Sequence, residues 1–338
     1  MGRFAALISS LLIGFIAMPA SGQSEVVRVG SFANITHSQA LVGKANGTFA
    51  RALGPAVRIE WKTFNAGPSA IEALFAGALD LAYIGPNPAL TGYIRSQGEA
   101  LRVIAGATSG GAALVVRADS GIARPADFHG KRVASPQLAN TQDVALRAWL
   151  RSQGLKPRTQ GGDVEVLPIA NADQLNLFLK QQLDAAWAPE PWASRLVREA
   201  HGRIFMDERQ LWPEGRFATA LLVVRTGYLH DHPELVRKWV AAHVELTDWI
   251  NQHLPQARQL INQQIKAETG MALSPLIIED AFSRLQITYD PVRSSLLTSA
   301  RWEFEAGFLG RRMPDLSGLC DLTILNQVLR SLQRKEVQ

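Results

Sequence analysis

Short apolar runs alternate with amphipathic stretches along the first third of the chain, in the order that strands and helices take in α/β proteins. The amphipathic stretches end at glycines such as Gly47 and Gly77, which commonly terminate helices. Because short links join each run to the next, we expect a mostly parallel sheet with helices on both faces. The predicted strands are 26–29, 57–61, 79–84 and 102–107, and the predicted helices are 38–45, 68–76 and one that starts at Pro88.

The alternation restarts after Ala113 and predicts a second α/β half. The segments 108–113 and 213–218 connect the two halves, and we predict that they are hinges between two lobes. The predicted strands of this half are 113–117, 131–135, 164–169 and 184–188, with a last strand at 218–225 after the second hinge. The predicted helices are 141–153, 172–182, which Asn171 caps, and 192–200.

From Pro233 onward the pattern is helical, with Leu235, Trp239 and Val240 among the apolar residues at helical spacing. The predicted helices are 233–253, 256–268, 275–286, 294–309 and 321–334. We expect them to pack on the first lobe. The predicted division is therefore a signal peptide at 1–22, a discontinuous lobe I at 23–112 and 215–338, and lobe II at 113–214.

The N-terminus has the three parts of a secretory signal peptide. Arg3 is its one charge, residues 4–17 are apolar, and the small residues Ala20, Ser21 and Gly22 follow. A membrane anchor is the alternative, but a spanning helix needs roughly 20 apolar residues. We therefore expect cleavage within residues 20–23 and a periplasmic protein that is soluble after cleavage.

Charge and cysteine content exclude several classes of protein. The net charge is +5, or +4 without Arg3, and the basic residues are scattered, so we expect no nucleic-acid partner. Cys320 is the single cysteine, and one cysteine cannot form an internal disulfide. With 47% apolar residues the core can supply the stability. We predict a monomer without a cofactor or a metal.

The links after the predicted strands share small residues, hydroxyls, amides and helix-starting prolines. In a doubly wound sheet, ligands bind beyond the carboxyl ends of the strands, where helices begin. A helix start presents unpaired N–H groups and about half a positive charge, which suits an anion. The links with this composition are 33–38, 64–69, 85–88, 108–111, 140–142 and 187–192.

Single residues in these links also have ordinary structural interpretations. Thr36, Asn65, Asn87 and Asn140 could serve only as helix caps, and Gly67 only as a helix start. His37 could be a partly exposed polar residue. Trp187 could be a core residue, and Glu190 at a helix start is favourable without any ligand. The functional prediction depends on their shared position at strand ends.

Several ordered segments resemble the substrate-binding proteins of sulfonate, taurine and nitrate ABC importers, from about Val26 to Leu329. The segments are Val27-Arg-Val-Gly-Ser-Phe-Ala33, Phe64-Asn-Ala-Gly-Pro68, Gly77-Ala-Leu-Asp80, Phe128-His-Gly-Lys-Arg-Val-Ala134 and Asp184-Ala-Ala-Trp-Ala-Pro-Glu-Pro-Trp192. The sequence departs from the family pattern at Ile84 and at Ala139-Asn140-Thr141, which leaves the identity of the anion open.

The resemblance implies the type II periplasmic-binding-protein fold: two α/β lobes, two crossovers, and C-terminal helices packed on lobe I. It implies a non-catalytic subunit that captures a small organic anion, such as an aliphatic sulfonate or taurine, and delivers it to an ABC permease with its ATPase. The residues that it suggests as ligand contacts are Asn34, Thr36, Asn65, Gly85, Asn87, Ser109, Asn140, Thr141 and Glu190. With His37, Gly67 and Trp187 they form the predicted site.

Other ligands and one enzyme class remain as alternatives. The same fold could bind nitrate, a thiamine-precursor pyrimidine, an aromatic acid or riboflavin.

The related pyrimidine synthases carry a cysteine-rich iron motif, whereas Cys320 lies far from the predicted links. His230-x-His232 is the one close histidine pair, and we expect it to cap a helix. If Glu190 faces the cleft, its carboxylate would suit the amine of a zwitterion.

Overall fold

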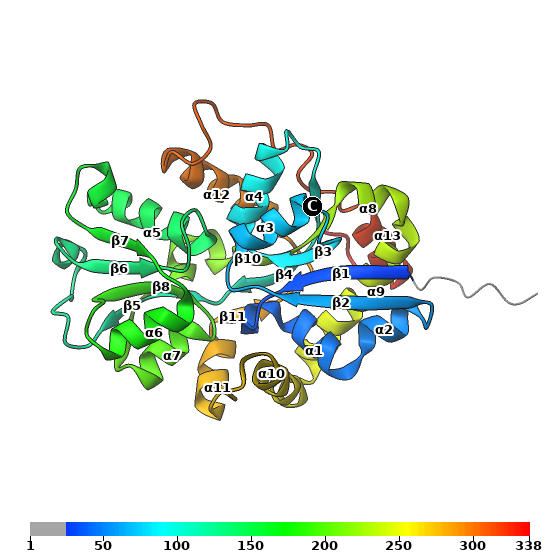
Figure 1. Ribbon diagram of the computed structural model, residues 1–338, viewed down its shortest axis with the longest axis horizontal. Helices are drawn as coiled ribbons and strands as arrows, with labels where there is room; N and C mark the ends of the chain where they lie inside the picture. The colour runs from blue at the N-terminus through cyan, green and yellow to red at the C-terminus, as the bar shows by residue number, and fades with distance from the viewer. Residues whose placement is uncertain (1–24) are drawn as a thin grey trace, which may run out of the picture.

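The structure, a computed structural model, describes residues 25–338, so the predicted signal peptide lies outside the described residues. The described chain forms two α/β halves, each built on its own sheet (Figure 1). We call them lobe I and lobe II. None of the helices between residues 25 and 338 combines the length and apolar character that a membrane crossing needs.

The sheet of lobe I has the strand order β11-β4-β10-β3-β1-β2. Its strands are β1 (Glu25–Ser31), β2 (Val57–Thr63), β3 (Leu81–Ile84), β4 (Leu101–Gly110), β10 (Ala218–Arg225) and β11 (Leu285–Ile287). The sheet of lobe II has the order β7-β6-β8-β5-β9. Its strands are β5 (Ala112–Arg117), β6 (Arg132–Ser135), β7 (Glu165–Pro168), β8 (Ala185–Pro189) and β9 (Gly202–Asp207).

The expected strand–helix alternation is confirmed, but the sheets are mixed rather than mostly parallel. The pairs β1–β2, β1–β3, β6–β7 and β6–β8 are parallel. The crossing strands run the other way: β10 pairs antiparallel with β3 and β4, and β5 pairs antiparallel with β8 and β9. Each crossing strand enters the middle of its new sheet from the neighbouring lobe, so it runs against its partners there.

Helices cover both faces of both sheets (Figure 1). Lobe I has α1 (Ser38–Asn46), α2 (Thr48–Leu53), α3 (Gly67–Phe75), α4 (Pro86–Arg95), α8 (Thr226–Asp231), α9 (Pro233–Gln252), α10 (Leu254–Thr269), α11 (Pro275–Ser283), α12 (Arg293–Glu305) and α13 (Thr323–Ser331). Lobe II has α5 (Thr141–Ser152), α6 (Asn171–Leu179) and α7 (Trp192–Glu199). The predicted C-terminal helices thus pack on lobe I, where Trp239 of α9 stacks on Phe49 with ring centroids 4.0 Å apart.

Some predicted caps are shifted by one or two residues. Ala170, not Asn171, precedes α6, and Asn171 is its first residue. Gly85 precedes α4, which begins before Asn87. His232 occupies the position before α9, but its Nδ1 lies 2.6 Å from a carboxylate oxygen of Glu25 and makes no capping bond. These shifts matter because consecutive residues at a helix start point in different directions.

The first crossing between the lobes is a pair of glycines with left-handed backbone. Gly110 and Gly111 have φ angles of 74° and 79°, which non-glycine residues rarely adopt. The Gly111 N–H donates to the Arg284 carbonyl at 2.9 Å, and its own carbonyl accepts from the Glu190 N–H at 2.8 Å. A β-carbon on Gly110 would lie 2.6 Å from the Arg284 carbonyl oxygen. The crossing therefore requires glycine at this position.

The return crossing is anchored by a buried carboxyl group. Glu208 follows β9 and accepts hydrogen bonds from the indole N–H of Trp187 at 2.7 Å and of Trp212 at 3.4 Å. Burial raises the pKa of Glu208 to about 7. Trp212 in turn stacks on Phe217 at 5.2 Å, just before β10. One acid thus connects the core of lobe II to the segment that returns to lobe I.

The raised pKa of Glu208 predicts a stability that falls as the pH rises. Below its unfolded pKa of about 4.5 both states are protonated; between 4.5 and 7 the unfolded state loses its proton first, so unfolding becomes easier. The loss approaches an order of 3 kcal/mol above pH 8. We expect urea unfolding to show a smaller loss from pH 5 to pH 8 in Glu208→Gln than in the wild type.

The exposed Glu279 offers a matched control, because Glu279→Gln makes the same chemical change in water. This control variant should keep the wild-type pH dependence. If Glu208→Gln also keeps it, Glu208 is ionised in the folded protein and the assigned pKa is wrong.

Candidate functional site

A small cavity of about 20 Å³ lies between the two lobes. Seven predicted residues line it: Asn34, Thr36, His37, Asn65, Gly85, Asn140 and Thr141. The other lining residues are Phe32, Ala66, Pro136, Gln142, Asn171, Pro189 and Thr219. The structure therefore brings together residues that are up to 187 positions apart in the chain (Phe32 and Thr219).

Helix N-termini from both lobes reach this cavity. Ala66 precedes α3, Gly85 precedes α4, Asn140 precedes α5, and Asn171 is the first residue of α6. Thr36 and His37 lie in the 3-10 turn (Ile35–His37) that leads into α1. None of α3 to α6 has a side-chain cap, so no side chain of its own satisfies the N–H groups of its first turn. The arrangement offers several partial positive charges to one point.

The cavity wall is polar but uncharged. Among the described residues that line it there is no arginine, lysine, aspartate or glutamate. Two polar atoms from lobe II, Thr141 Oγ1 and Asn171 Oδ1, are buried there without a hydrogen-bond partner. A buried polar atom without a partner is costly, so the Thr141 hydroxyl is suited to donate to an anion, whereas the Asn171 oxygen can only accept and needs a donor.

His37 adds a neutral donor. Its Nδ1 accepts a hydrogen bond from the Phe32 N–H at 3.3 Å, which leaves the proton on Nε2. Burial, with a smaller contribution from Lys44, lowers the pKa of His37 to about 3, so the ring carries no charge at neutral pH. The ring stacks on Phe32 at 4.5 Å, which fixes its orientation in the cavity wall.

The two lobes approach each other closely at Gly85. A β-carbon on Gly85 would lie 2.4 Å from Thr141 Oγ1, so glycine here lets the start of α5 approach the start of α4. The backbone of Gly85 is extended, with φ −69°, so the close approach and not the conformation requires glycine. A second contact joins the lobes where the Trp192 indole N–H donates to Asn34 Oδ1 at 3.0 Å.

Glu190 does not face the cavity, which corrects one prediction. It is fully buried, and its carboxylate pairs with Arg284 at 2.9 Å and accepts from the Ser194 N–H at 3.1 Å. Arg284 follows α11 of lobe I, so this pair joins the lobes beside the Gly111 crossing. The function of Glu190 is thus architectural, because its charge is already compensated within the protein.

Asn87 and Ser109 are also directed elsewhere. The Asn87 amide donates to Glu303 of α12 at 2.8 Å, because α4 begins before it and turns its side chain toward that helix. Ser109 lies inside β4, which extends to Gly110, and its hydroxyl accepts from the Phe217 N–H at 3.2 Å. Both side chains support the framework around the cavity and do not line it.

Trp187 and Gly67 complete the corrections. Trp187 is fully buried in the core of lobe II, and its indole N–H is bound to Glu208. Gly67 packs against Pro88, where a β-carbon would lie 2.2 Å from the ring. It allows the starts of α3 and α4 to lie side by side without itself lining the cavity.

Sequence reasoning missed several lining residues for identifiable reasons. Pro136 and Asn171 lie one residue beyond a predicted strand end or before a predicted helix start, so a wider window would have included them. Gln142 lies inside the predicted link 140–142 but is not among the predicted contacts. Thr219 gave no such signal, because it lies at the beginning of β10. This strand is antiparallel to its neighbours, so its amino end lies where their carboxyl ends do.

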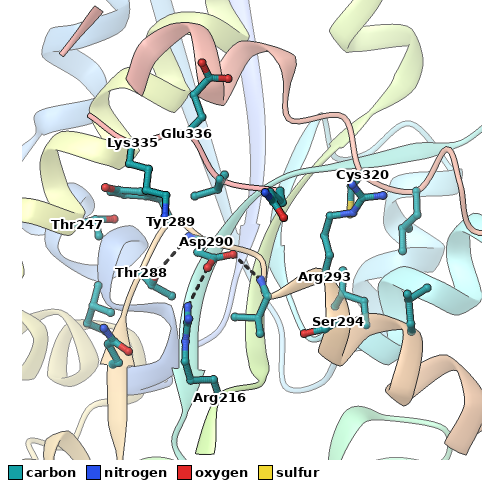
Figure 2. A pocket seen from close by; sticks show the side chains of 18 of the residues that line it. Arg216, Thr247, Thr288, Tyr289, Asp290, Arg293, Ser294, Cys320, Lys335 and Glu336 are labelled. Atoms are coloured by element: carbon teal, nitrogen blue, oxygen red, sulfur yellow. Dashed lines mark hydrogen bonds and ion pairs between the residues drawn. The ribbon is translucent and has the colours of Figure 1, made fainter. Parts of the chain in front are cut away.

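A larger cavity of about 870 Å³ lies on lobe I beside β11 and the start of α12 (Figure 2). Its acids are ion-paired within the protein: Asp290 with Arg216 at 2.8 Å, Asp248 with Arg334, and Glu336 with Arg330 at 3.0 Å. It contains no convergence of helix starts from both lobes. The inter-lobe cavity is therefore the better candidate for the functional site.

Known proteins resemble this chain in sequence. The sequence model of the NMT1-like family matches residues 20–266. The taurine-binding periplasmic protein of Escherichia coli (strain K12) is 27% identical over 233 residues, which cover 69% of this chain and 68% of that protein. A putative aliphatic sulfonates-binding protein of Bacillus subtilis (strain 168) is 23% identical over 325 residues, 94% of this chain and 93% of that one.

Solved structures give the same fold. The alkanesulfonate-binding protein SsuA from Xanthomonas axonopodis pv. citri, bound to MOPS, superposes with a TM-score of 0.73 at 20% identity, over 87% of this chain and 97% of that chain. The periplasmic nitrate-binding protein NrtA from Synechocystis PCC 6803 gives 0.74 at 14% identity, over 92% and 90%. The predicted two-lobed periplasmic-binding-protein fold is confirmed.

The buried pair of Glu190 and Arg284 generates a stability prediction. Arg284→Ala leaves a buried carboxylate without its cation, which costs roughly 3 kcal/mol in the free energy of unfolding. Urea denaturation followed by circular dichroism measures this loss. The double variant Glu190→Gln with Arg284→Ala should recover part of it, because a neutral amide needs no counter-charge.

The exposed pair of Arg237 and Glu234, whose nitrogen and oxygen lie 2.8 Å apart, is the control. Arg237→Ala should lower the free energy of unfolding far less than Arg284→Ala does, since exposed ion pairs contribute little. Equal losses in the two arginine variants would show that the Glu190 pair is not a buried junction between the lobes.

Proposed function

Since this chain belongs to the NMT1-like family, we propose that it is the substrate-binding subunit of an ABC importer. It captures a small organic anion, an aliphatic sulfonate or a taurine-like compound, between its lobes. It works as a monomer in the periplasm, is not an enzyme, and delivers the anion to a membrane permease with its ATPase. The names of its relatives, a taurine-binding periplasmic protein and a putative aliphatic sulfonates-binding protein, support this proposal.

One observation carries the proposal: the starts of helices from both lobes converge on a single uncharged cavity. Backbone N–H groups and the helix dipole favour an oxyanion there. A sulfonate has three oxygens that accept such hydrogen bonds and a charge that stays constant over the physiological pH range. Neutral donors hold it by many short contacts and leave no buried arginine unpaired when it departs.

Closure of the lobes follows from the same geometry. The cavity of about 20 Å³ has room for little more than one water molecule, so a larger ligand enters only when the lobes separate. Gly110 and Gly111 provide the crossing about which they move. Because the donors come from both lobes, the ligand has more contacts in the closed form and shifts the population toward it. The permease then distinguishes the loaded protein by its shape.

Nitrate is the second candidate ligand. The small volume of the cavity favours a compact anion, and the nitrate-binding protein NrtA has the same fold. Nitrate and sulfonate are both monoanions that accept hydrogen bonds without donating any. They differ in the tail of the sulfonate, which needs additional space when the lobes close.

A thermal-shift panel on the complete protein in its secreted form tests the proposed function. A ligand that binds the native state adds about 2.7 kcal/mol at a hundredfold excess over its Kd. We expect ethanesulfonate to raise the melting temperature, with sodium chloride at equal ionic strength as the control. A shift with nitrate alone would select the second candidate, and a flat response to all sulfonates and to nitrate would contradict the proposal.

The close approach at Gly85 provides a test of closure. Gly85→Ala places a methyl group on Thr141 Oγ1, so the lobes cannot close fully on the ligand. We expect calorimetry to show at least about tenfold weaker sulfonate binding, with a melting temperature near the wild-type value in the absence of ligand. Adding Thr141→Ala removes the clashing oxygen, so the two changes should be non-additive.

Gly227→Ala serves as the control, because its β-carbon would meet only the flexible end of Arg225. This variant should bind as the wild type does. Unchanged affinity in Gly85→Ala would mean that the ligand is bound without the lobe contact seen here.

A further inference from the structure

We infer that the cleft selects a monoanion with a short, uncharged tail and discriminates against a zwitterion such as taurine. The inference rests on the proposed function and narrows its substrate class. It differs from what the name of the taurine-binding relative would suggest. The inference rests on two observations. The cavity wall contains no charged side chain, and the carboxylates that follow its lining residues in the sequence are already paired with arginines.

The cavity has no group that could neutralise an ammonium. Its lining residues within 25–338 include no carboxylate, and its helix starts present only the positive ends of their dipoles. A buried cation needs a counter-charge or is strongly disfavoured. The positive helix ends that attract a sulfonate repel an ammonium placed a few ångströms away.

The two carboxylates closest to the cavity along the chain are already paired with cations. Glu190 follows the lining residue Pro189 but binds Arg284. Asp143 follows the lining residue Gln142 and is fully buried, but it pairs with Arg147 at 2.9 Å. Asp143 also accepts hydrogen bonds from the Ser135 hydroxyl at 2.8 Å and the Ala139 N–H at 3.0 Å. Redirecting either acid toward a ligand would leave a buried arginine unpaired.

The remaining acceptors are neutral. Asn34 Oδ1 already accepts from Trp192, and Asn171 Oδ1 is buried without a partner. An amide oxygen can accept a hydrogen bond from an ammonium but does not compensate its charge. Phe32, Ala66, Pro136 and Pro189 supply the apolar part of the wall, which suits a methyl or ethyl group.

Isothermal titration calorimetry with ethanesulfonate, propanesulfonate and taurine tests the inference. Taurine is ethanesulfonate with an added ammonium, and propanesulfonate has a similar length without the charge. We expect both uncharged sulfonates to bind at least about tenfold more tightly than taurine at pH 7. Taurine binding as tight as either would overturn the inference and leave the proposed function standing. No binding of any of the three would overturn the sulfonate assignment, and with it this inference, while nitrate in the thermal-shift panel decides whether the proposed anion-binding function stands.

Asn171→Asp tests the physical cause in the same assay. It adds a carboxylate to the cavity wall at the start of α6, where an acid is also favourable for the helix. We expect the ratio of taurine affinity to ethanesulfonate affinity to rise at least about tenfold. The control Asn176→Asp adds the same charge to an exposed position of α6 and should leave the ratio unchanged.

An unchanged ratio in Asn171→Asp would overturn charge balance as the cause. Equal changes in the two variants would do the same, because they would show a general effect of net charge. If Asn171→Asp does not fold, as judged by circular dichroism, the wild-type ratio of taurine to propanesulfonate decides alone.

Discussion

Several helix starts point at one small volume, and each presents N–H groups that no capping side chain satisfies. Like partial charges that meet in a buried place repel one another, so the closed arrangement is incomplete without an anion. This constraint explains why the lobes need to separate and close. It also explains why the cavity is lined by Gly85, Thr141 and asparagines, whose small size lets the backbone approach the ligand.

The two sheets deliver these helix starts because most of their strands point toward the cleft. The links after β1, β2 and β3 reach it from lobe I, and those after β6 and β7 reach it from lobe II. The two crossing strands, β5 and β10, run in the opposite direction and bring the chain into each sheet from the other lobe. The left-handed glycines between β4 and β5 make the turn from one sheet into the other without a loop that would fill the cleft.

The fold was predictable from the sequence, and so were about half of the residues that line the candidate cavity. The rule that ligands sit beyond strand ends located Asn34, Asn65, Gly85 and Thr141, because parallel strands place their ends at one edge. It failed to place Asn87 and Ser109, since two residues of shift at a helix start or three at a strand end turn a side chain away from the cavity. It also could not reveal that Glu190 meets Arg284, a partner 94 residues away whose position depends on the tertiary fold.

Charged and neutral groups have separate tasks at the junction of the lobes. Arg284 with Glu190 and Arg198 with Asp280 join α7 of lobe II to α11 and the residue after it. These pairs satisfy each other, so they stabilise the junction whether or not a ligand is present. The cavity uses donors that have no internal partner, such as Thr141 Oγ1. An arginine and a carboxylate placed there would neutralise each other and close the cleft without a ligand. Neutral donors make closure depend on the anion, and this dependence is what a transport subunit requires.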